Sequence, residues 1–208
     1  MVIRDDRVGG NPEVWTQDGL GYDPGVDARL SRLWDEHEIK DVIYRYCRGV
    51  DRHDLDLVRR CYHSDARDEH GSFEGSVDEF LLWLESLLVR YSWTMHCVAN
   101  ILIEFGDEAN VAVSETYGVA MHRSPEKKAY LNLVSGFRYV DRFERREDGW
   151  RVAHRKVVSE WSIHPPDDAW WEIPEHLDQG VRGTSDALYT MLSTLSSSGG
   201  NPGGCDVT

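Results

Sequence analysis

Hydrophobic residues in the first third of the chain recur every three or four positions, the spacing of one face of a helix. This spacing predicts a helix over residues 27–49, with Gly49 near its end, where helices often stop. The helix carries its apolar stripe on Ile39, Val42, Ile43, Tyr46, Cys47 and Val50. Asp51 follows Cys47 by about one helical turn and continues the stripe, where a carboxylate is costly unless it has a partner.

Two shorter helices are predicted before the pattern changes. The first fits residues 54–63, and the second begins after Ser76, because Ser76 and Glu79 form a capping box. The second helix carries an apolar face made by Val77, Phe80, Leu81, Leu84, Leu87 and Leu88. Between the two helices, residues 66–75 predict two short extended pieces around Gly71.

Beyond residue 91 the pattern predicts strands. Four long strands fit residues 92–105, 109–122, 130–146 and 150–163. Turn signals separate them at Gly106-Asp107, Ser124-Pro125 and Asp148-Gly149. Helices first and a strand meander afterwards predict an α+β domain with a curved antiparallel sheet.

The predicted domain has an extension at each end. Residues 1–25 are rich in Gly, Asp and Pro and predict an irregular N-terminal arm, and residues 26–165 form the domain. Residues 166–208 form a C-terminal extension with a possible short helix near 184–194. Its last part, SSSGGNPGGCDVT, is typical of a disordered tail.

Composition limits the classes of partner. The formal net charge of −14 argues against binding to nucleic acid or to anionic membranes. No apolar run has the length of a membrane helix, and the N-terminus lacks the apolar core of a signal peptide. The four cysteines, Cys47, Cys61, Cys97 and Cys205, show no CxxC pair, so reduced thiols in a cytoplasmic protein are predicted.

The main candidate for chemistry is an acid and an imidazole. His96 lies in the otherwise apolar segment SWTMHCVANILIEF. Asp51 could hold one nitrogen of His96 while the other takes a proton from a substrate carbon. A buried structural pair, or an Asp51 that only caps the next helix, is the alternative. Tyr46 could direct its phenol at a substrate oxygen or could belong to the core.

The last predicted strand offers His154 and Arg155, which fall on opposite faces. Only one of them can enter a cavity, and the alternation of the strand leaves open which one. A guanidinium in a cavity would bind an anion or a leaving group, and a surface arginine is the alternative.

The segment HSDARDEH, with His63, Asp65, Asp68, Glu69 and His70, raises the question of a metal. Its spacing matches no metal motif, so no metal is predicted, and His70 or Asp68 at a cavity rim is the preferred interpretation. The sequence has no Gly-rich phosphate loop, no GxSxG elbow and no HExxH motif, so no cofactor is predicted.

Three segments resemble the SnoaL-like branch of the NTF2-like superfamily. They are VDRHDLDLVRRCYHSDARDEHGSFEGS, TMHCVAN and SGFRYVDRFERREDGWRVAHRKVVSEW, within a span from about Leu30 to His164. The resemblance implies an NTF2-like cone, in which a bent sheet and N-terminal helices close around a deep apolar pocket. Its enzymes include scytalone dehydratase, bile acid 7α-dehydratase and hexachlorocyclohexane dehydrochlorinase.

The resemblance also implies roles for residues. Asp51 and His96 match the catalytic Asp–His pair of these enzymes, Tyr46 matches a tyrosine that precedes the Asp, and Arg155 matches a cavity arginine. Arg155 is thereby favoured over His154. Either His70 or His122 could match the second cavity histidine of scytalone dehydratase. The candidate substrate-binding residues are His70, Asn100, Tyr117 and Tyr139.

The sequence therefore predicts a cofactor-independent lyase that performs a dehydratase-type elimination. The expected substrate is a mid-sized apolar cyclic compound such as a polyketide, steroid or terpenoid. An isomerase or aldol-type cyclase with the same base is one alternative, and a non-catalytic small-molecule-binding or assembly module is another. A dimer or trimer of the chain is expected from the resemblance.

Overall fold

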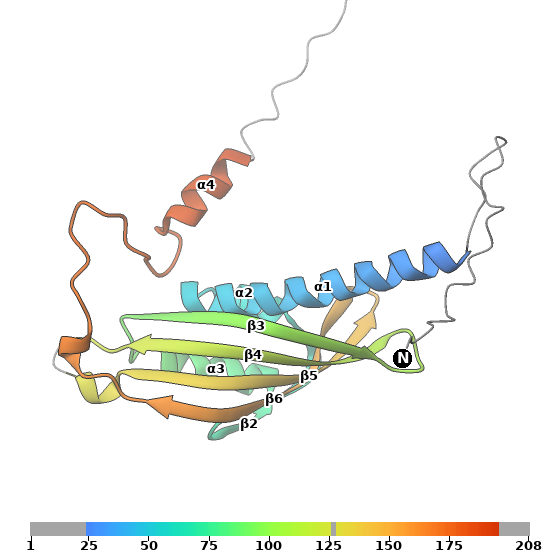
Figure 1. Ribbon diagram of the computed structural model, residues 1–208, viewed down its shortest axis with the longest axis horizontal. Coiled ribbons are helices and arrows are strands. Elements are labelled where there is room, and N and C mark those ends of the chain that lie inside the picture. The colour runs from blue at the N-terminus through green and yellow to red at the C-terminus, as the bar shows by residue number, and fades with distance from the viewer. Residues whose placement is uncertain (1–23, 126–127, 196–208) are drawn as a thin grey trace, which may run out of the picture. The chain divides into compact units, whose positions relative to one another are not determined.

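The computed structural model describes residues 24–125 and 128–195 (Figure 1). Its helices are α1 (Pro24–Arg52), α2 (Leu55–Arg60), α3 (Val77–Leu88) and α4 (Ala187–Leu195). Its strands are β1 (Tyr62–His70), β2 (Phe73–Ser76), β3 (Trp93–Phe105), β4 (Val111–Arg123), β5 (Leu133–Arg146) and β6 (Gly149–Ile163). Short 3-10 turns, η1 (Ala129–Leu131) and η2 (Asp167–Ala169), complete the described elements.

The chain divides after Asp35 into two compact units. Within the first unit, the described residues are the initial turns of α1. The second unit contains every other element and is the folded domain considered below. Part of the predicted N-terminal arm, residues 1–23, and the predicted disordered tail, residues 196–208, lie outside the described residues.

The strands form one six-stranded sheet with the order β2-β1-β6-β5-β4-β3. The predicted meander of four long strands is confirmed as β3 to β6, with neighbouring strands antiparallel. The short strand β1, which lies outside that meander, pairs with β6 in parallel, so the whole sheet is mixed. Local alternation of side chains carries no information on how two strands so far apart in sequence pair.

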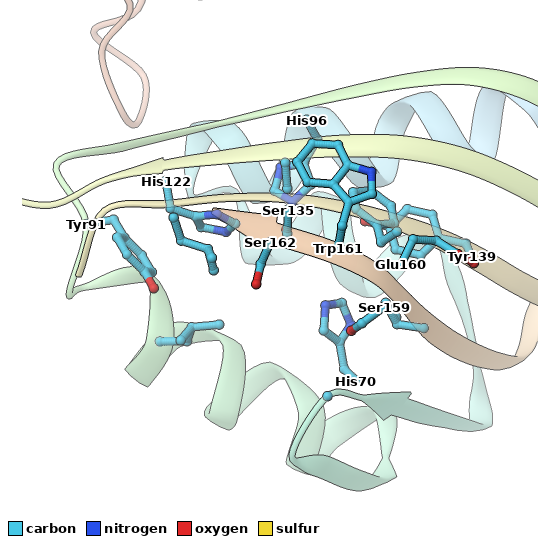
Figure 2. Close-up of a pocket in the computed structure, with 16 residues that line it drawn as sticks. His70, Tyr91, His96, His122, Ser135, Tyr139, Ser159, Glu160, Trp161 and Ser162 are labelled. Carbon is cyan, nitrogen blue, oxygen red and sulfur yellow. The ribbon is translucent and has the colours of Figure 1, made fainter. Parts of the chain in front are cut away.

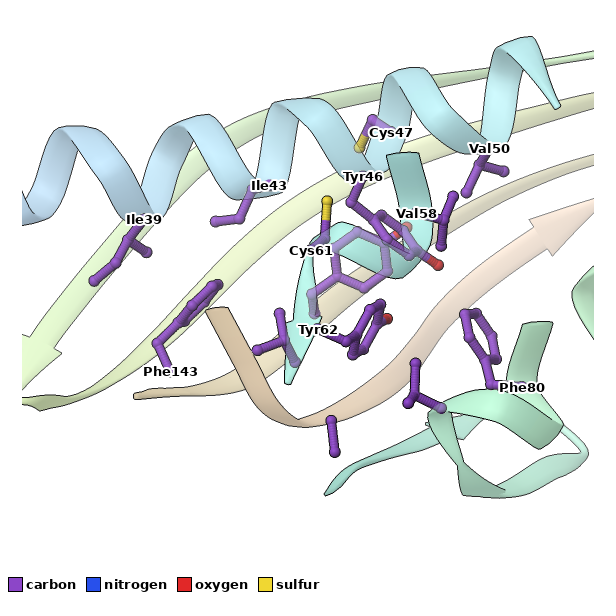
Figure 3. Packing of buried hydrophobic residues seen from close by; sticks show 14 of the residues in the cluster. Ile39, Ile43, Tyr46, Cys47, Val50, Val58, Cys61, Tyr62, Phe80 and Phe143 are labelled. Carbon is purple, nitrogen blue, oxygen red and sulfur yellow. The ribbon is translucent and has the colours of Figure 1, made fainter. Parts of the chain in front are cut away.

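The domain core lies where α1, α2 and α3 pack on the sheet (Figure 3). The predicted stripe of α1 is buried at Ile39, Ile43, Tyr46, Cys47 and Val50. The predicted face of α3 is buried at Val77, Phe80, Leu84 and Leu88. Full burial of one large apolar side chain favours folding by about 1.5–3 kcal/mol, so these two stripes fix the helices to the sheet.

The capping box of α3 is present as predicted. The backbone N–H of Ser76 donates to Glu79 Oε2 at 2.8 Å, and the backbone N–H of Glu79 donates to Ser76 Oγ at 3.4 Å. These contacts satisfy N–H groups that a helix start leaves without an intrahelical partner. They set the start of α3 and hence the position of the wall it contributes to the site.

Gly49 is expected near the end of the first helix, but its main role is in the packing of α1 against α2. Helix α1 continues to Arg52 and ends before His53, which takes a φ of 56°. A Cβ atom at Gly49 would lie 2.7 Å from Val58 Cγ2 of α2. Gly49 therefore allows α1 and α2 to pack closely, and α1 runs far enough for Asp51 to belong to its last turn.

Three irregularities interrupt the register of the antiparallel strand pairs and decide which side chains of these strands face the helices. They lie between Val98 and Ile101 in β3, between Gly136 and Phe137 in β5, and between Arg142 and Phe143 in β5. At the third, Arg142 pairs with His154 and Phe143 pairs with Val152, so Ala153 of β6 is an extra residue. As a result, Val152 and Arg155 are both fully buried although an odd number of steps separates them.

The C-terminal segment returns to the end of α1. The backbone N–H of Gly183 donates to Arg52 O at 2.8 Å, and Arg52 Nη1 lies 3.3 Å from Asp186 Oδ2. Arg182 Nη1 donates to Leu88 O at the end of α3 at 2.7 Å. The predicted helix near 184–194 is present as α4. Among the described residues, no helix combines the length and apolar character needed to cross a membrane.

Candidate active site

A cavity of about 420 Å³ lies between the sheet and the end of α3 (Figure 2). Its polar lining includes three histidines, His70, His96 and His122, and two tyrosines, Tyr91 and Tyr139. Ser135, Ser159 and Ser162 add hydroxyl groups, while Leu87, Phe137, Val157 and Trp161 supply apolar surface. A concave apolar site with a few convergent polar groups is the usual form of a small-molecule site.

Asp51 and His96 make the contact that the sequence predicts. His96 Nδ1 lies 2.7 Å from Asp51 Oδ1, and both side chains are largely buried. Asp51 also accepts hydrogen bonds from Thr94 Oγ1 at 3.0 Å and from the His96 backbone N–H at 2.8 Å. Because an ionised carboxylate only accepts, Nδ1 carries the proton of a neutral His96, and Nε2 keeps its lone pair.

His96 lines the cavity, whereas Asp51 stands behind it. Asp51 and His96 together line a second, shallower hollow, beside Arg52 of α1 and Asp186 and Leu188 of the C-terminal segment. The imidazole therefore forms part of the wall between the two hollows. An imidazole held from behind by a carboxylate is suited to act as a general base toward a ligand in the main cavity.

His122 is the neighbour of His96 inside the cavity. The two ring centroids are 5.7 Å apart, and the rings are nearly perpendicular. Burial, together with the nearby His96, lowers the pKa of His122 to about 4. His122 is therefore neutral near pH 7, and its buried Nδ1 has no hydrogen-bond partner among the described residues. A neutral imidazole has one nitrogen that donates a hydrogen bond and one that accepts, so it can bind a polar ligand atom of either kind.

Tyr46 and Arg155 do not line the cavity, so the expectation that they contact the substrate needs correction. Arg155 is fully buried, and its Nε and Nη2 donate to Asp141 at 2.8 and 2.6 Å. Its guanidinium carbon lies 4.0 Å from the ring centroids of Tyr46 and of Tyr139. The extra residue Ala153 turns Arg155 inward, and Tyr139 then separates it from the cavity.

The four predicted substrate-binding residues divide into two pairs. His70 and Tyr139 line the cavity, whereas Asn100 and Tyr117 do not. Asn100 is exposed, because the irregularity between Val98 and Ile101 leaves it out of the inward-facing row. Thr116 and Gly118, on either side of Tyr117 in β4, are buried. Successive side chains of a strand face opposite sides, so Tyr117 points away from the cavity and is 44% exposed.

His154 does not enter the cavity either. Its Nε2 lies 2.8 Å from Glu69 Oε1, and its side chain is 44% exposed. Neither of the two candidates therefore lines the cavity: His154 lies at the surface, and Arg155 is buried behind the cavity wall.

The sequence did not single out Tyr91, Ser135, Ser159 or Ser162, which also line the cavity. Serine and tyrosine are common on strands and loops, so their types alone give no signal of a site. Burial raises the pKa of Tyr91, which keeps its phenol protonated and able to donate a hydrogen bond.

Within the described residues, no group of three or more His, Cys, Asp or Glu side chains is arranged to hold a metal. His63, the first histidine of the segment considered for a metal, is buried, and its Nε2 lies 2.9 Å from Glu144 O. Its contacts are those of a residue that fixes β1 to the end of β5.

Comparisons with known proteins agree with this architecture. The family model described as "SnoaL-like domain" matches residues 31–156. The uncharacterised protein Rv2910c of Mycobacterium tuberculosis is 24% identical over 130 residues, which cover 61% of this chain and 86% of that protein.

Two solved structures illustrate the likeness of fold. One is hexachlorocyclohexane dehydrochlorinase LinA-type3 of Novosphingobium barchaimii, with a TM-score of 0.60, 18% identity, and coverage of 70% of this chain and 99% of that chain. The other is a Novosphingobium aromaticivorans protein described provisionally as a scytalone dehydratase, with a TM-score of 0.58, 15% identity, and coverage of 78% and 99%. At such identities the likeness shows the fold alone.

Proposed function

Because the chain belongs to the SnoaL-like family of the NTF2-like superfamily, we propose that it is a cofactor-independent lyase that eliminates water or another small group from a cyclic substrate. The observation that carries the proposal is the contact between Asp51 and His96 in the wall of a cavity of suitable size. Two structural neighbours are described as enzymes of elimination reactions, which agrees with the proposal.

His96 is the proposed base. Its Nε2 removes a proton from a ring carbon next to a carbonyl, and Asp51 stabilises the imidazolium that forms. The three hydrogen bonds to Asp51 hold the carboxylate in place, so that this stabilisation requires little rearrangement.

The negative charge that develops on the carbonyl oxygen needs hydrogen-bond donors. Tyr91 and His122 are the proposed donors, because both line the cavity and neither is charged near pH 7. His122 thereby takes the place of the second cavity histidine that the resemblance implies. Tyr46 and Arg155 become positioning residues, which support Tyr139 from behind.

The proposed substrate is a mid-sized, mostly apolar ring compound, such as a polyketide, steroid or terpenoid. The cavity volume lies in the lower part of the range of about 300–1,000 Å³ that is usual for small-molecule sites. Phe137 and Trp161 offer apolar surface for a ring, and the serines offer hydrogen bonds to its substituents.

An isomerase or an aldol-type cyclase is the second candidate, because abstraction of the same proton yields the same enolate. The mass of the product separates the reactions: an elimination loses the leaving group, whereas an isomerisation loses nothing. A non-catalytic binding module remains the third possibility. A homo-oligomer and a cytoplasmic location also remain predictions.

The test uses a panel of bicyclic ketones and measures exchange of the proton next to the carbonyl for deuterium in D2O by NMR. The wild-type protein should catalyse exchange, and His96→Gln should reduce the rate about 10²–10⁴-fold, the usual contribution of a general base. Asp51→Asn should lose nearly as much, because an amide can hold the wrong tautomer and cannot offset the imidazolium charge. Both variants must first show a wild-type thermal unfolding transition.

Cys97→Ser, on the exposed side of β3 next to His96, serves as the matched control and should leave exchange unchanged. Wild-type exchange rates in folded His96→Gln would make the Asp51–His96 contact structural and refute the proposed base. Binding of the ketones without exchange by the wild-type protein would favour the binding module.

A further inference from the structure

The cavity contains a second pairing of a histidine with a carboxylate, on the side opposite the first. Asp68 of β1 is fully buried, and His70 at the end of the same strand lines the cavity. Asp68 Oδ1 lies 3.4 Å from His70 Nδ1. Neither of these two atoms has a hydrogen-bond partner among the described residues. Figure 2 shows His70 across the cavity from His96 and His122.

The ring of His70 is held in place by aromatic side chains. Its centroid lies 5.5 Å from that of Phe80, with the rings nearly parallel, and 5.6 Å from that of Trp83. The Tyr139 ring completes the contact at 6.5 Å. Because Nδ1 is buried on the side of Asp68, Nε2 is the nitrogen that His70 presents to the cavity.

The buried charges around Asp68 do not cancel. Arg155 is the one fully buried cation among the described residues near this carboxylate, and its Nε and Nη2 both bind Asp141. Asp68 is therefore a second buried carboxylate beside a single guanidinium. A proton on His70 would neutralise the remaining negative charge, because Nδ1 lies 3.4 Å from Asp68 Oδ1.

The two pairs differ in how far the carboxylate is already satisfied. Asp51 accepts three hydrogen bonds, two of them from donors other than the His96 ring. Asp68 accepts one, from Tyr62 Oη at 2.6 Å. More of the charge of Asp68 is thus left to act on its histidine. The two histidines are accordingly suited to opposite tasks, His96 to take a proton and His70 to give one.

Other titratable groups face His70 from the neighbouring strands. Tyr139 and Asp141 lie on β5, Arg155 on β6 and His122 on β4, while α3 contributes the uncharged rings of Phe80 and Trp83. His122 is neutral near pH 7, so its repulsion of a protonated His70 is absent there. The formal charges of Asp68, Asp141 and Arg155 sum to a net negative charge beside the ring.

We propose that His70, oriented by Asp68, is the acid of the cavity and protonates the group that leaves. The inference rests on the proposed function, since it assigns the second half of the same elimination. His96 Nε2 takes the proton from the ring carbon, and the electrons of that C–H bond form the new double bond. The C–O bond breaks, and the departing oxygen takes the proton from His70 Nε2 and leaves as water. Exchange with solvent then returns a proton to His70 and removes one from His96.

The experiment compares two leaving groups on one ring system. A tetralone that carries a hydroxyl group β to the carbonyl requires protonation of the leaving oxygen, whereas the β-chloro tetralone releases chloride without it. His70→Gln should slow elimination of water about 10²–10⁴-fold, the usual contribution of a general acid, and leave elimination of chloride little changed. His96→Gln should slow both. Deuterium exchange of unsubstituted tetralone should depend on His96 and not on His70.

Asp68→Asn should slow elimination of water in the same direction as His70→Gln, and the double variant should be no slower than His70→Gln alone. His70→Phe keeps the ring contacts with Phe80 and Trp83 and replaces His70→Gln if that variant fails to fold. His154→Gln is the matched control, since His154 also has a carboxylate partner, Glu69, but lies outside the cavity.

Equal loss on both leaving groups, or loss on neither, would overturn the acid role of His70 while leaving His96 as the base. A wild-type protein that neither exchanges tetralone nor eliminates from either derivative would overturn the proposed function itself. The two failures are thus distinguishable.

Discussion

Arg155→Met should destabilise the domain strongly, because it leaves a buried carboxylate without its partner. Arg155 and Asp141 are both fully buried and share two hydrogen bonds, at 2.8 and 2.6 Å. Removal of one partner of a buried ion pair typically costs about 3–5 kcal/mol. For a chain of this length, that loss corresponds to a fall of about 6–20 °C in Tm. Methionine keeps the apolar stem of the side chain but loses the contacts of the guanidinium with the rings of Tyr46 and Tyr139, which adds to the cost.

The free energy of unfolding is measured by urea titration followed by circular dichroism. The double variant Arg155→Met/Asp141→Leu removes both charges and should recover most of the loss, since apolar replacement of a whole buried pair is often neutral. Arg138→Met is the matched control: Arg138 also pairs with two carboxylates, Glu115 and Glu160, but is partly exposed. Such surface pairs contribute about 0–1 kcal/mol. A single variant no worse than Arg138→Met, or a double variant as unstable as Arg155→Met, would refute the reasoning.

Two further predictions concern pH and packing. The folded state holds His122 with a pKa of about 4, below its ordinary 6.5, so the unfolded chain binds the proton first. Stability should therefore be intact above pH 6.5 and fall as the pH drops toward 4, by up to about 3 kcal/mol relative to His122→Gln in parallel urea titrations. An identical pH dependence in the variant would contradict this assignment. Gly49→Ala should cost about 1–3 kcal/mol despite the higher helix propensity of alanine, because its methyl group would press on Val58. Val58→Ala in the same chain should reduce the additional cost of Gly49→Ala, and calorimetry of the four proteins in that cycle would show whether it does.

The elements of this fold are predictable from local patterns because each obeys one periodicity. The apolar stripe from Ile39 to Val50 and the capping box at Ser76 specify two helices without reference to the rest of the chain. The turn at Asp148-Gly149 specifies the last hairpin in the same way, and Gly149 takes the positive φ of 92° that favours glycine. The contact of Asp51 with His96 can also be predicted from the sequence, because each residue continues an apolar face of its own element.

Asn100 and Arg155 lie away from their expected positions for the same physical reason, an irregularity in the strand register. Strict alternation along β3 would put Asn100 on the same side as His96, but the irregularity after Val98 breaks the alternation. Whether a strand carries an extra residue depends on its pairing with neighbours, which local patterns do not contain. The parallel pairing of β1 with β6, which brings Asp68 beside Arg155, is a long-range property of the same kind.

The extra residue Ala153 affects how this chain is aligned with its relatives. A relative that lacks one residue at this point would have a regular β6, and the side chain two positions after its equivalent of Val152 would face inward. A gap placed after Arg155 instead of at Ala153 would then equate Arg155 with a surface residue. Insertions and deletions of one residue in β6 thus exchange a buried cation for a solvent-facing side chain, with no substitution required. Sequence comparisons within the family should place that gap from the strand pairing before assigning any role to the arginine.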